Sequence, residues 1–348
     1  MIILILGNNY SAKSFYNLFS KDKNNIVFST IHNYSNCVDL NSNKDIIDFC
    51  EANEVNFVLI TNPKYLISSL QEELSRLDIS VFSPSCDSLG IFSSKIKAKR
   101  FMYKNKIKTP KFQVIDKPQS AIEYIKTTNI PQAIKPDEHT YQECSKFCET
   151  YSKAQKIIND LFTCGNKKIL IEDYIEGKNI SVWAISNGYD FKIILASLKY
   201  QDDAALVNSS VLNEELKIEI EDNFINQTIQ ALNFQDEEYV GIIGFDFILT
   251  KDNQLYLLNY NGFFDEINVD FFTKGFEINW IDVFESAIVG DVFLKHDFKN
   301  HKNTMLTVRQ NEKIEFLGAN TMTNLERYLK ELDYDLTLYD EAKKIWKY

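Results

Sequence analysis

The sequence predicts an α/β protein that begins with a parallel sheet and continues as mixed α+β structure. Over the first 85 residues, short apolar runs alternate with segments of helical spacing, whereas the apolar runs after residue 179 are longer and often follow one another directly. Strands that alternate with helices form βαβ units and pair in parallel, and consecutive strands form antiparallel hairpins. We therefore expect parallel pairing at the start of the chain and antiparallel pairing later.

The first 85 residues contain the elements of an open parallel sheet. The expected strands are residues 2–6, 26–29, 57–60 and 81–82, and the expected helices are residues 10–19, 45–52 and 65–77. Ligands of such sheets bind beyond the carboxyl ends of the strands. We therefore expect a ligand at that edge.

The rest of the chain is expected to form a small α+β unit followed by longer strands. A helix at 93–105 precedes strands at 112–115, 132–135 and 168–174 and helices at 119–127 and 145–162. The later strands are 180–186, 191–198, 241–250 and 254–260, the later helices are 213–232 and 281–292, and a tail from 304 reads as strand, helix (323–332) and strand. All six prolines lie between Pro63 and Pro136, so proline interrupts none of the later elements.

The composition is that of a soluble globular protein. The 348 residues are 45% hydrophobic and 25% charged, and 38 Lys and Arg against 49 Asp and Glu give a net charge of −11. This charge disfavours nucleic acid and anionic membrane surfaces as partners. Six dispersed cysteines without a CxxC pair indicate reduced thiols, and no apolar run approaches the ~18 residues of a membrane span, so we expect a cytoplasmic protein.

A predicted hairpin around residue 252 carries three oxygen-bearing side chains. Asp246 lies on its first strand, and Asn259 and Asn261 lie on its second. Residues two apart on a strand face the same way, and antiparallel pairing can bring Asp246 opposite the two asparagines. Mg²⁺ prefers oxygen ligands, so this face is a candidate metal site, with a solvated polar face as the alternative.

Two lysines and a strand edge are candidates for nucleotide contacts. Lys95 lies near a predicted helix start and Lys135 ends a predicted strand, where a lysine can act as a point charge for phosphate oxygens. The backbone of residues 172–177 (EDYIEG) can hydrogen-bond an adenine edge, with Ile175 against the ring. The alternatives are ordinary solvated lysines and a plain strand–turn junction.

Other motifs are less specific. A zinc site at His139, Cys144 and Cys148 would lack a fourth ligand, and residues 7–9 contain too few glycines for a dinucleotide fingerprint. Five phenylalanines follow the hairpin and are expected in the core, although the first two could instead line a substrate pocket: Phe263, Phe264, Phe271, Phe272 and Phe276.

The order and spacing of these motifs resemble the ATP-grasp superfamily and, within it, the glycinamide ribonucleotide synthetases (phosphoribosylamine–glycine ligases). The resemblance covers residues 1–292. In chain order it rests on 45–84, 94–102 (SKIKAKRFM) with 108–110 (KTP), 133–135 (AIK), 169–177 (ILIEDYIEG) and the trio Asp246, Asn259 and Asn261. It implies an N-terminal parallel-sheet domain at 1–85, a two-lobed ATP-grasp module at 86–292 with its small lobe at about 111–178, and a small C-terminal α+β segment at 293–348.

The resemblance also implies an ATP-dependent carboxylate–amine ligase. A small-molecule carboxylate would become an acyl phosphate, and a small-molecule amine would then displace the phosphate. ATP and Mg²⁺ are the implied cofactors. The implied ATP contacts are Lys95, Lys135, Glu172, Asp173, Tyr174, Ile175 and Asn179, and the implied metal ligands are Asp246, Asn259 and Asn261. The resemblance indicates no catalytic residue and no oligomeric state.

Several positions depart from the pattern of that family. Where the family has a glycine-rich loop over the phosphates, residues 136–147 contain no glycine and instead carry Asp137, Glu138, His139 and Glu143. Asn259 replaces a metal-binding carboxylate, Asn179 replaces a ribose-binding glutamate, and residues 61–63 (TNP) replace a Gly-Pro-Glu motif. We therefore expect a substrate outside purine biosynthesis. The alternative is a non-catalytic relative that binds a nucleotide or a partner protein.

Overall fold

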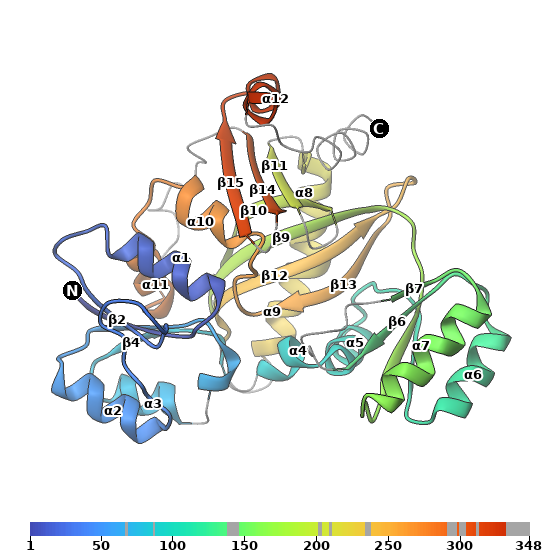
Figure 1. Ribbon diagram of the computed structural model, residues 1–348, viewed down its shortest axis with the longest axis horizontal. Coiled ribbons are helices and arrows are strands. Elements are labelled where there is room, and N and C mark those ends of the chain that lie inside the picture. The colour runs from blue at the N-terminus through green and yellow to red at the C-terminus, as the bar shows by residue number, and fades with distance from the viewer. Residues whose placement is uncertain are drawn as a thin grey trace.

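The computed structural model places three bodies in a row (Figure 1). The N-terminal domain lies at one end, a large sheet in the middle and a small lobe at the other end. The structure describes residues 1–66, 69–85, 88–137, 146–200, 204–208, 211–233, 238–290, 298, 304–310 and 313–331.

The N-terminal domain is the open parallel sheet that the sequence predicts. Its strands lie in the order β2-β1-β3-β4 and are parallel throughout, with α1 on one face and α2 and α3 on the other. The predicted helix at 65–77 is wrong at its start, because Asn62 caps a 3-10 turn that begins at Pro63. The elements are β1 (Ile2–Leu6), α1 (Tyr10–Phe19), β2 (Ile26–Ser29), α2 (Asn43–Ala52), β3 (Phe57–Ile60), η1 (Pro63–Tyr65), α3 (Leu70–Ser75) and β4 (Ser80–Phe82).

The central sheet is antiparallel and, in the described residues, runs in the order β13-β12-β9-β10-β11-β14-β15. Its strands are β9 (Lys178–Asn187), β10 (Phe191–Tyr200), β11 (Ala204–Asn208), β12 (Val240–Leu249), β13 (Leu255–Asn261), β14 (Thr304–Gln310) and β15 (Lys313–Ala319). The sequence did not predict β11. The predicted order of strand, helix and strand in the tail is also wrong up to residue 331, because β15 returns along β14 before α12 (Met322–Glu331). The predicted last strand lies outside the described residues.

The small lobe is a four-stranded sheet covered by two helices. Its elements are β5 (Phe112–Ile115), α6 (Pro118–Thr127), β6 (Gln132–Pro136), β7 (Lys146–Cys148), α7 (Tyr151–Thr163) and β8 (Ile169–Asp173). The strands lie in the order β5-β8-β6-β7. The predicted helix at 145–162 starts later than expected, because residues 146–148 pair with β6 and the Thr150 hydroxyl caps the helix at the Lys153 N–H.

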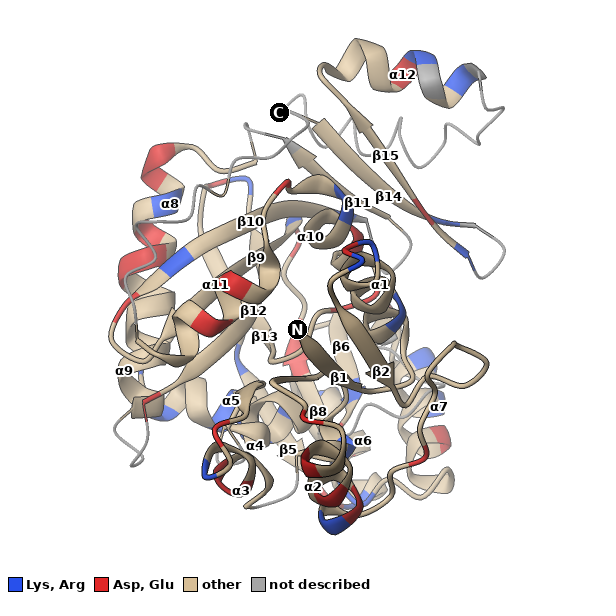
Figure 2. Ribbon diagram, turned by 90° about the vertical axis from the view of Figure 1, so that its left-hand side faces the viewer, with Lys and Arg blue, Asp and Glu red and all other residues tan. Residues whose placement is uncertain are grey.

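The remaining helices pack between and around the sheets. They are α4 (Leu89–Ser93), α5 (Lys95–Lys104), α8 (Glu214–Ile220), η2 (Glu221–Ile225), α9 (Asn226–Asn233), α10 (Val269–Gly275) and α11 (Trp280–Ile288). The predicted helix at 213–232 is continuous but contains a π turn at η2, and α10 was not predicted. In Figure 2, charged residues lie mainly on helices such as α2, α8 and α11 rather than along the central strands. No helix in the described part of the chain is long and apolar enough to cross a membrane.

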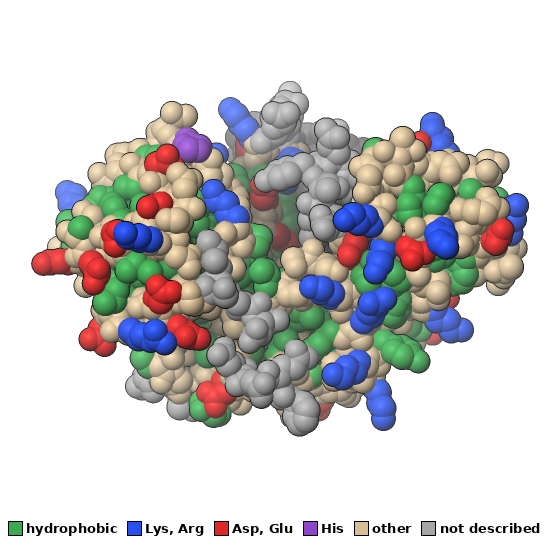
Figure 3. All heavy atoms as spheres, turned by 90° about the horizontal axis from the view of Figure 1, so that it is seen from below, with side chains coloured by type: hydrophobic (Ala, Val, Ile, Leu, Met, Phe, Trp, Pro, Cys, Tyr) green, Lys and Arg blue, Asp and Glu red, His purple; other side chains and the backbone are tan. Residues whose placement is uncertain are grey.

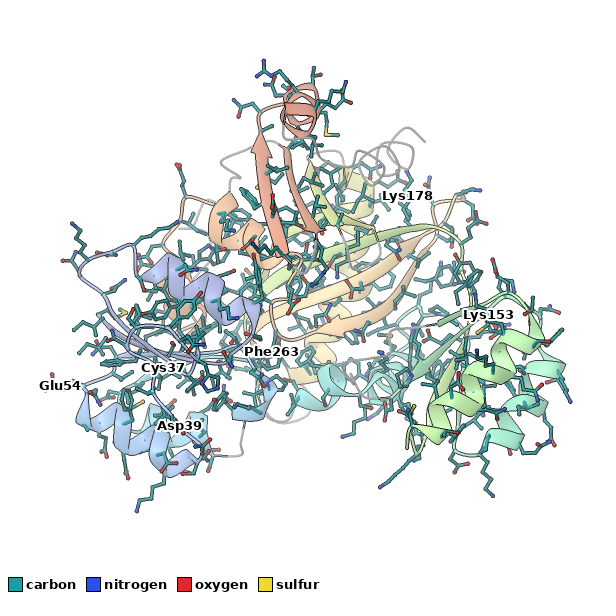
Figure 4. All side chains as sticks on the ribbon, in the orientation of Figure 1. Cys37, Asp39, Glu54, Lys153, Lys178 and Phe263 are labelled. Atoms are coloured by element: carbon teal, nitrogen blue, oxygen red, sulfur yellow. The ribbon has the colours of Figure 1, made fainter. Side chains whose placement is uncertain are left out.

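One hydrophobic core joins the N-terminal domain to the central sheet. It contains Phe15 of α1, Phe82 of β4, Trp183 of β9 and Phe284 of α11, and the rings of Phe82 and Phe284 stack with centroids 4.0 Å apart. Four of the five phenylalanines after the hairpin are buried in this core, as expected: Phe264, Phe271, Phe272 and Phe276. Figure 4 shows Phe263 where the N-terminal domain meets the central sheet, and it packs at the edge of the N-terminal core.

Candidate functional site

Three charged side chains from three different elements meet where the small lobe adjoins the central sheet. The carboxylate of Glu172 of β8 forms ion pairs with two ammonium groups, that of Lys99 of α5 at 2.8 Å from Oε1 and that of Lys135 of β6 at 2.5 Å from Oε2. The side chains of Glu172, Lys99 and Lys135 are 2%, 1% and 11% exposed. This lysine–glutamate triad holds two positive charges and one negative charge, so it leaves excess positive charge in a buried place.

Short-range bonds fix Lys99 in the triad. Ser94 is extended and caps α5 at the Lys97 N–H, so the helix begins at residue 95 and Lys99 lies one turn into it. The Lys99 ammonium also donates to Thr109 Oγ1 at 2.6 Å and to the Leu257 carbonyl of β13 at 3.4 Å. Lys99 therefore links Glu172 of the small lobe to the β12–β13 hairpin, which carries the candidate metal ligands.

Burial and mutual charge shift the pKa values of the triad. Burial lowers the pKa of Lys99 to about 8, with Lys135 adding to the shift and Glu172 opposing it. Burial alone would raise the pKa of Glu172, but the ammonium groups of Lys135 and Lys99 outweigh it and the pKa is lowered. Glu172 is therefore ionised at neutral pH, and Lys99 loses its proton at a lower pH than an ordinary lysine does.

The structure divides the predicted nucleotide contacts into two groups. Lys135 and Glu172 are both in the triad, but the Glu172 side chain binds lysines. Lys95 is the first residue of α5 and its N–H donates to the Asp137 carbonyl at 3.1 Å, so Lys95 lies at the helix end. Sequence reasoning missed Lys99, although its position one helical turn after Lys95 is a signal that could have found it.

The predicted adenine-binding segment continues directly from the triad. The N–H groups of Asp173 and Tyr174 donate to Lys111 and Pro131 carbonyls at 2.9 and 3.4 Å. Ile175 is half-buried, and Asn179 is exposed on β9. Gly177 passes so close to β12 that an added Cβ would lie 2.4 Å from the Leu249 carbonyl oxygen, so only glycine fits this turn.

A second charged cluster lies on the central sheet. Asp246 of β12 is opposite Asn259 of β13, next to a bulge, and the Asn261 amide donates to Asp246 Oδ2 at 2.8 Å. The Lys199 ammonium of β10 is 3.3 Å from Asp246 Oδ1 and 2.7 Å from Asp265 Oδ2. We call Asp246, Lys199 and Asp265 the aspartate–lysine cluster. The predicted trio therefore lies together on adjacent strands, whereas sequence reasoning did not predict Lys199 and Asp265 beside it.

The aspartate–lysine cluster does not fit a resident Mg²⁺. Both oxygens of Asp246 already accept hydrogen bonds, one from an ammonium and one from an amide. Burial would lower the pKa of Lys199, but Asp246 and Asp265 raise it further, so the lysine stays charged. Within the described residues, no three His, Cys, Asp or Glu side chains gather as metal ligands. The metal assignment of Asp246, Asn259 and Asn261 stays a prediction.

The carboxyl edge of the N-terminal sheet is closed by its own side chains. The Gly7 N–H donates to Thr30 Oγ1 at 2.9 Å, and Asn9 both caps α1 at the Ala12 N–H and donates to the Thr61 carbonyl at 2.8 Å. Thr61 Oγ1 lies 2.0 Å from the place where a Cβ on Gly7 would be. Groups that could bind a ligand at this edge are therefore engaged within the domain.

The glycine-free segment is described only at its two ends. Asp137 accepts hydrogen bonds at Oδ1 from the Ser94 hydroxyl at 2.6 Å and the Ile96 N–H at 2.9 Å. Its carboxylate therefore stabilises the start of α5. Glu138, His139, Glu143 and Cys144 lie outside the described residues, so the structure does not test the zinc alternative, which needs His139 and Cys144.

Figure 3 shows a hollow between the N-terminal domain and the small lobe, with acidic side chains deep inside it.

Comparison with known proteins identifies the family. The model of the phosphoribosylglycinamide synthetase ATP-grasp (A) domain matches residues 93–269, half of the chain. The chain belongs to this ATP-grasp family. It is 25% identical over 244 residues to phosphoribosylamine–glycine ligase of Clostridium acetobutylicum and 22% identical over 248 residues to that of Fusobacterium nucleatum. These matches cover 64% and 65% of this chain but only 58% and 57% of the two relatives.

Solved structures of ATP-grasp proteins share the fold of the whole chain. Phosphoribosylamine–glycine ligase from Thermotoga maritima superimposes with a TM-score of 0.76 at 16% identity and covers 96% of both chains. The ADP complex of an N5-carboxyaminoimidazole ribonucleotide synthetase gives 0.74 at 12% identity, covering 98% of this chain and 97% of that one. L-amino acid ligase from Bacillus licheniformis gives 0.68 at 11% identity, covering 95% and 96%. The predicted ATP-grasp fold is confirmed.

Proposed function

We propose that this ATP-grasp protein is an ATP-dependent carboxylate–amine ligase that acts through an acyl phosphate. The lysine–glutamate triad carries the proposal, because it gathers two ammonium groups around one carboxylate beside the strand edge proposed for adenine. Excess positive charge held in a buried place suits the phosphates of a nucleotide, since charge-assisted hydrogen bonds are strong there.

The proposed reaction has two steps. A carboxylate oxygen of the acid attacks the γ-phosphorus, the bond from that phosphorus to the β–γ bridging oxygen breaks, and ADP leaves. The nitrogen of the amine then attacks the acyl carbon, the C–O bond to phosphate breaks, and the amine loses a proton as the amide forms. Lys135 would position the phosphates, and the buried charge of Lys99 behind Glu172 would help to offset the negative charge that develops on them.

We also propose that the amine is not phosphoribosylamine, although the relatives named above carry that substrate in their names. The support is the closed carboxyl edge of the N-terminal sheet, where Gly7 and Thr30 exchange hydrogen bonds and the Thr61 hydroxyl donates to the Leu6 carbonyl and to Asn9 Oδ1. A phosphate placed there would have to displace these bonds. A non-catalytic nucleotide-binding protein is the second candidate. The observation that favours it is the ion pair between Lys199 and Asp246, which engages the carboxylate predicted to bind Mg²⁺.

Nucleotide binding can be tested by replacing Lys135. Lys135→Ala should weaken ATP binding by about 1.5–3 kcal/mol, or roughly 10- to 150-fold in Kd, the value of a charge-assisted hydrogen bond. Isothermal titration calorimetry measures this. Lys156→Ala changes an exposed lysine of α7 in the same lobe and is the matched control, so it should bind ATP like the parent. Equal affinity of Lys135→Ala and the parent would contradict the triad assignment.

Turnover separates the candidate functions. A ligase releases phosphate from ATP only with a suitable acid, and amide formation requires the amine. We expect phosphate release with members of a panel of amino acids and small carboxylic acids. Adding phosphoribosylamine to glycine should release no more phosphate than glycine alone. ATP binding without phosphate release across the panel would favour the non-catalytic candidate. Release that depends on phosphoribosylamine would contradict the proposed substrate range.

A further inference from the structure

The ammonium of Lys199 lies between two carboxylates. Its side chain is 13% exposed, while those of Asp246 and Asp265 are 24% and 23% exposed. The ammonium bridges Oδ1 of Asp246 and Oδ2 of Asp265, which lie 47 and 66 residues further along the chain. The bridge therefore joins β10, β12 and the turn after β13.

The carboxylates facing Lys199 are held by further donors. Asp246 Oδ2 accepts the Asn261 amide at 2.8 Å. Asp265 Oδ1 accepts the Asn268 N–H at 2.8 Å, and its Oδ2 accepts the Asn268 amide at 3.1 Å. All four carboxylate oxygens thus have a donor, and a metal ion could bind them only by displacing some of these donors.

The strand that supplies Lys199 also supports the turn that supplies Asp265. Ser197 lies two residues before Lys199, so it faces the same way on β10. The Ser197 hydroxyl is completely buried and donates to Asn268 Oδ1 at 2.8 Å, and Asn268 is itself completely buried. Since Asn268 orients Asp265, the position of the ammonium between the carboxylates is set by buried contacts and not by a freely moving surface lysine.

We propose that Lys199 is the resident cation of this centre, taking the place between Asp246 and Asp265 that a divalent ion would need. The chain alone then holds no divalent ion there. An ammonium has three N–H donors, and Asp246 and Asp265 take two of them among the described residues, which leaves one for a ligand oxygen. The further statement that this oxygen belongs to a nucleotide phosphate rests on the proposed function.

The test removes the ammonium and asks whether a metal enters. Lys199→Met keeps most of the apolar side chain, lacks its charge and leaves two carboxylates facing the vacated place, a donor set suited to hard cations. Mn²⁺ is titrated into metal-free protein without nucleotide, and free Mn²⁺ is followed by electron paramagnetic resonance. Lys199→Met should bind one Mn²⁺ at least roughly tenfold more tightly than the parent, since one positive charge is gone.

Three variants serve as controls. Lys199→Met combined with Asp265→Asn should lose the new binding. Lys199→Arg, which keeps the charge, should bind no more Mn²⁺ than the parent. Lys274→Met removes another lysine from a carboxylate, the buried Asp270 at 2.8 Å, and should create no site because Tyr10 and Ser14 also occupy that carboxylate.

Two results would overturn the proposal. The first is a folded Lys199→Met protein, judged by circular dichroism, that binds Mn²⁺ no better than the parent. The second is parent protein that binds Mn²⁺ tightly and loses that binding in Asp246→Asn; this measurement decides the matter if Lys199→Met does not fold. Neither titration contains nucleotide, so their outcome is independent of the ATP-binding result for Lys135→Ala.

Discussion

Glu172 shows how one residue can organise a site. Its carboxylate is 2% exposed and binds one ammonium from α5 and another from β6. Taking three charges out of water is costly, and the cost is offset only while each charge keeps its partner. At the junction of two sheets, Glu172 therefore fixes the positions of Lys99 and Lys135, and Lys135 is the group proposed to contact phosphate.

Replacing Glu172 tests this dependence. Glu172→Gln should destabilise the protein by about 3–5 kcal/mol at pH 7, because two buried lysines lose their carboxylate. The share of this loss that comes from Lys99 is limited to about 1–2 kcal/mol at pH 7, because a lysine with a pKa of about 8 can lose its proton instead, at about 1.36 kcal/mol per pKa unit. With a Lys99 pKa of about 8, the loss should be smaller at pH 9, where Lys99 is largely neutral in the parent. Urea unfolding at both pH values measures it.

An exposed glutamate on the following turn provides the control. Glu176 pairs with Lys251 at 3.3 Å, but the two side chains are 76% and 88% exposed. Glu176→Gln should leave the urea midpoint unchanged, because an exposed pair contributes little to stability. A Glu172→Gln protein as stable as Glu176→Gln would show that the ion pairs of Glu172 contribute nothing measurable to stability.

At the scale of elements, the boundary between α4 and α5 positions the triad. The sequence 93–105 has continuous helical spacing, yet Ser94 is extended and a new helix begins at Lys95. The cause is Asp137, which follows β6 and accepts hydrogen bonds from Ser94 and from the Ile96 N–H. An acidic group at a helix N-terminus satisfies a free N–H and interacts favourably with the helix dipole.

Removing this cap should weaken the connection between β6 and α5. Asp137→Ala should cost about 1–2 kcal/mol of stability, as expected for a lost N-cap interaction. It should also weaken ATP binding if Lys99 and Lys135 must be aligned. Asp116→Ala, at an exposed position after β5, is the control and should leave both values unchanged. Thermal melts with and without ATP measure both effects, and an unchanged Asp137→Ala melt would contradict the capping role.

At the scale of the whole molecule, the N-terminal domain and the central sheet form one unit. They share a core, and the completely buried Asp270 of α10 accepts hydrogen bonds from Tyr10 at 2.8 Å and Ser14 at 3.0 Å, both on α1. The small lobe instead has a core of its own, built from β5, β6, β8, α6 and α7. Glu172 of the small lobe pairs with Lys99 of α5, which with Thr109 contacts the Leu257 carbonyl of the central sheet.

Hydrogen exchange should therefore reveal two units and not three. Amides of β1 and β9 should open with the same free energy as urea is increased, because their side chains pack in one core. Amides of β8 in the small lobe should open at lower free energy. Asp270→Asn should lower the values for β1 and β9 together and leave β8 unchanged. Exchange of β1 well before β9 would instead identify the N-terminal domain as a separate unit.

The alternation of apolar runs and helical segments was enough to predict β1, β2 and β3 with the bounds seen in the structure. The reason is local: a short apolar strand between amphipathic helices carries its pattern in its own residues. The same pattern failed where a distant partner decides the outcome. Residues 146–148 have helical spacing but pair with β6. The helix predicted at 93–105 is interrupted at Ser94, whose hydroxyl donates to Asp137.

The sequence by itself indicated the family and the parallel N-terminal sheet, and it predicted Lys135, Glu172 and Asp246 as candidate site residues. Only the tertiary structure decided which side chains face them. Lys99 reaches Glu172 from another element, and Lys199 reaches Asp246 across β9 from β10, 47 residues away in sequence. The physical reason is that electrostatic energy depends on distance in space and on burial, and both are set by the packing of sheets that the local pattern does not encode.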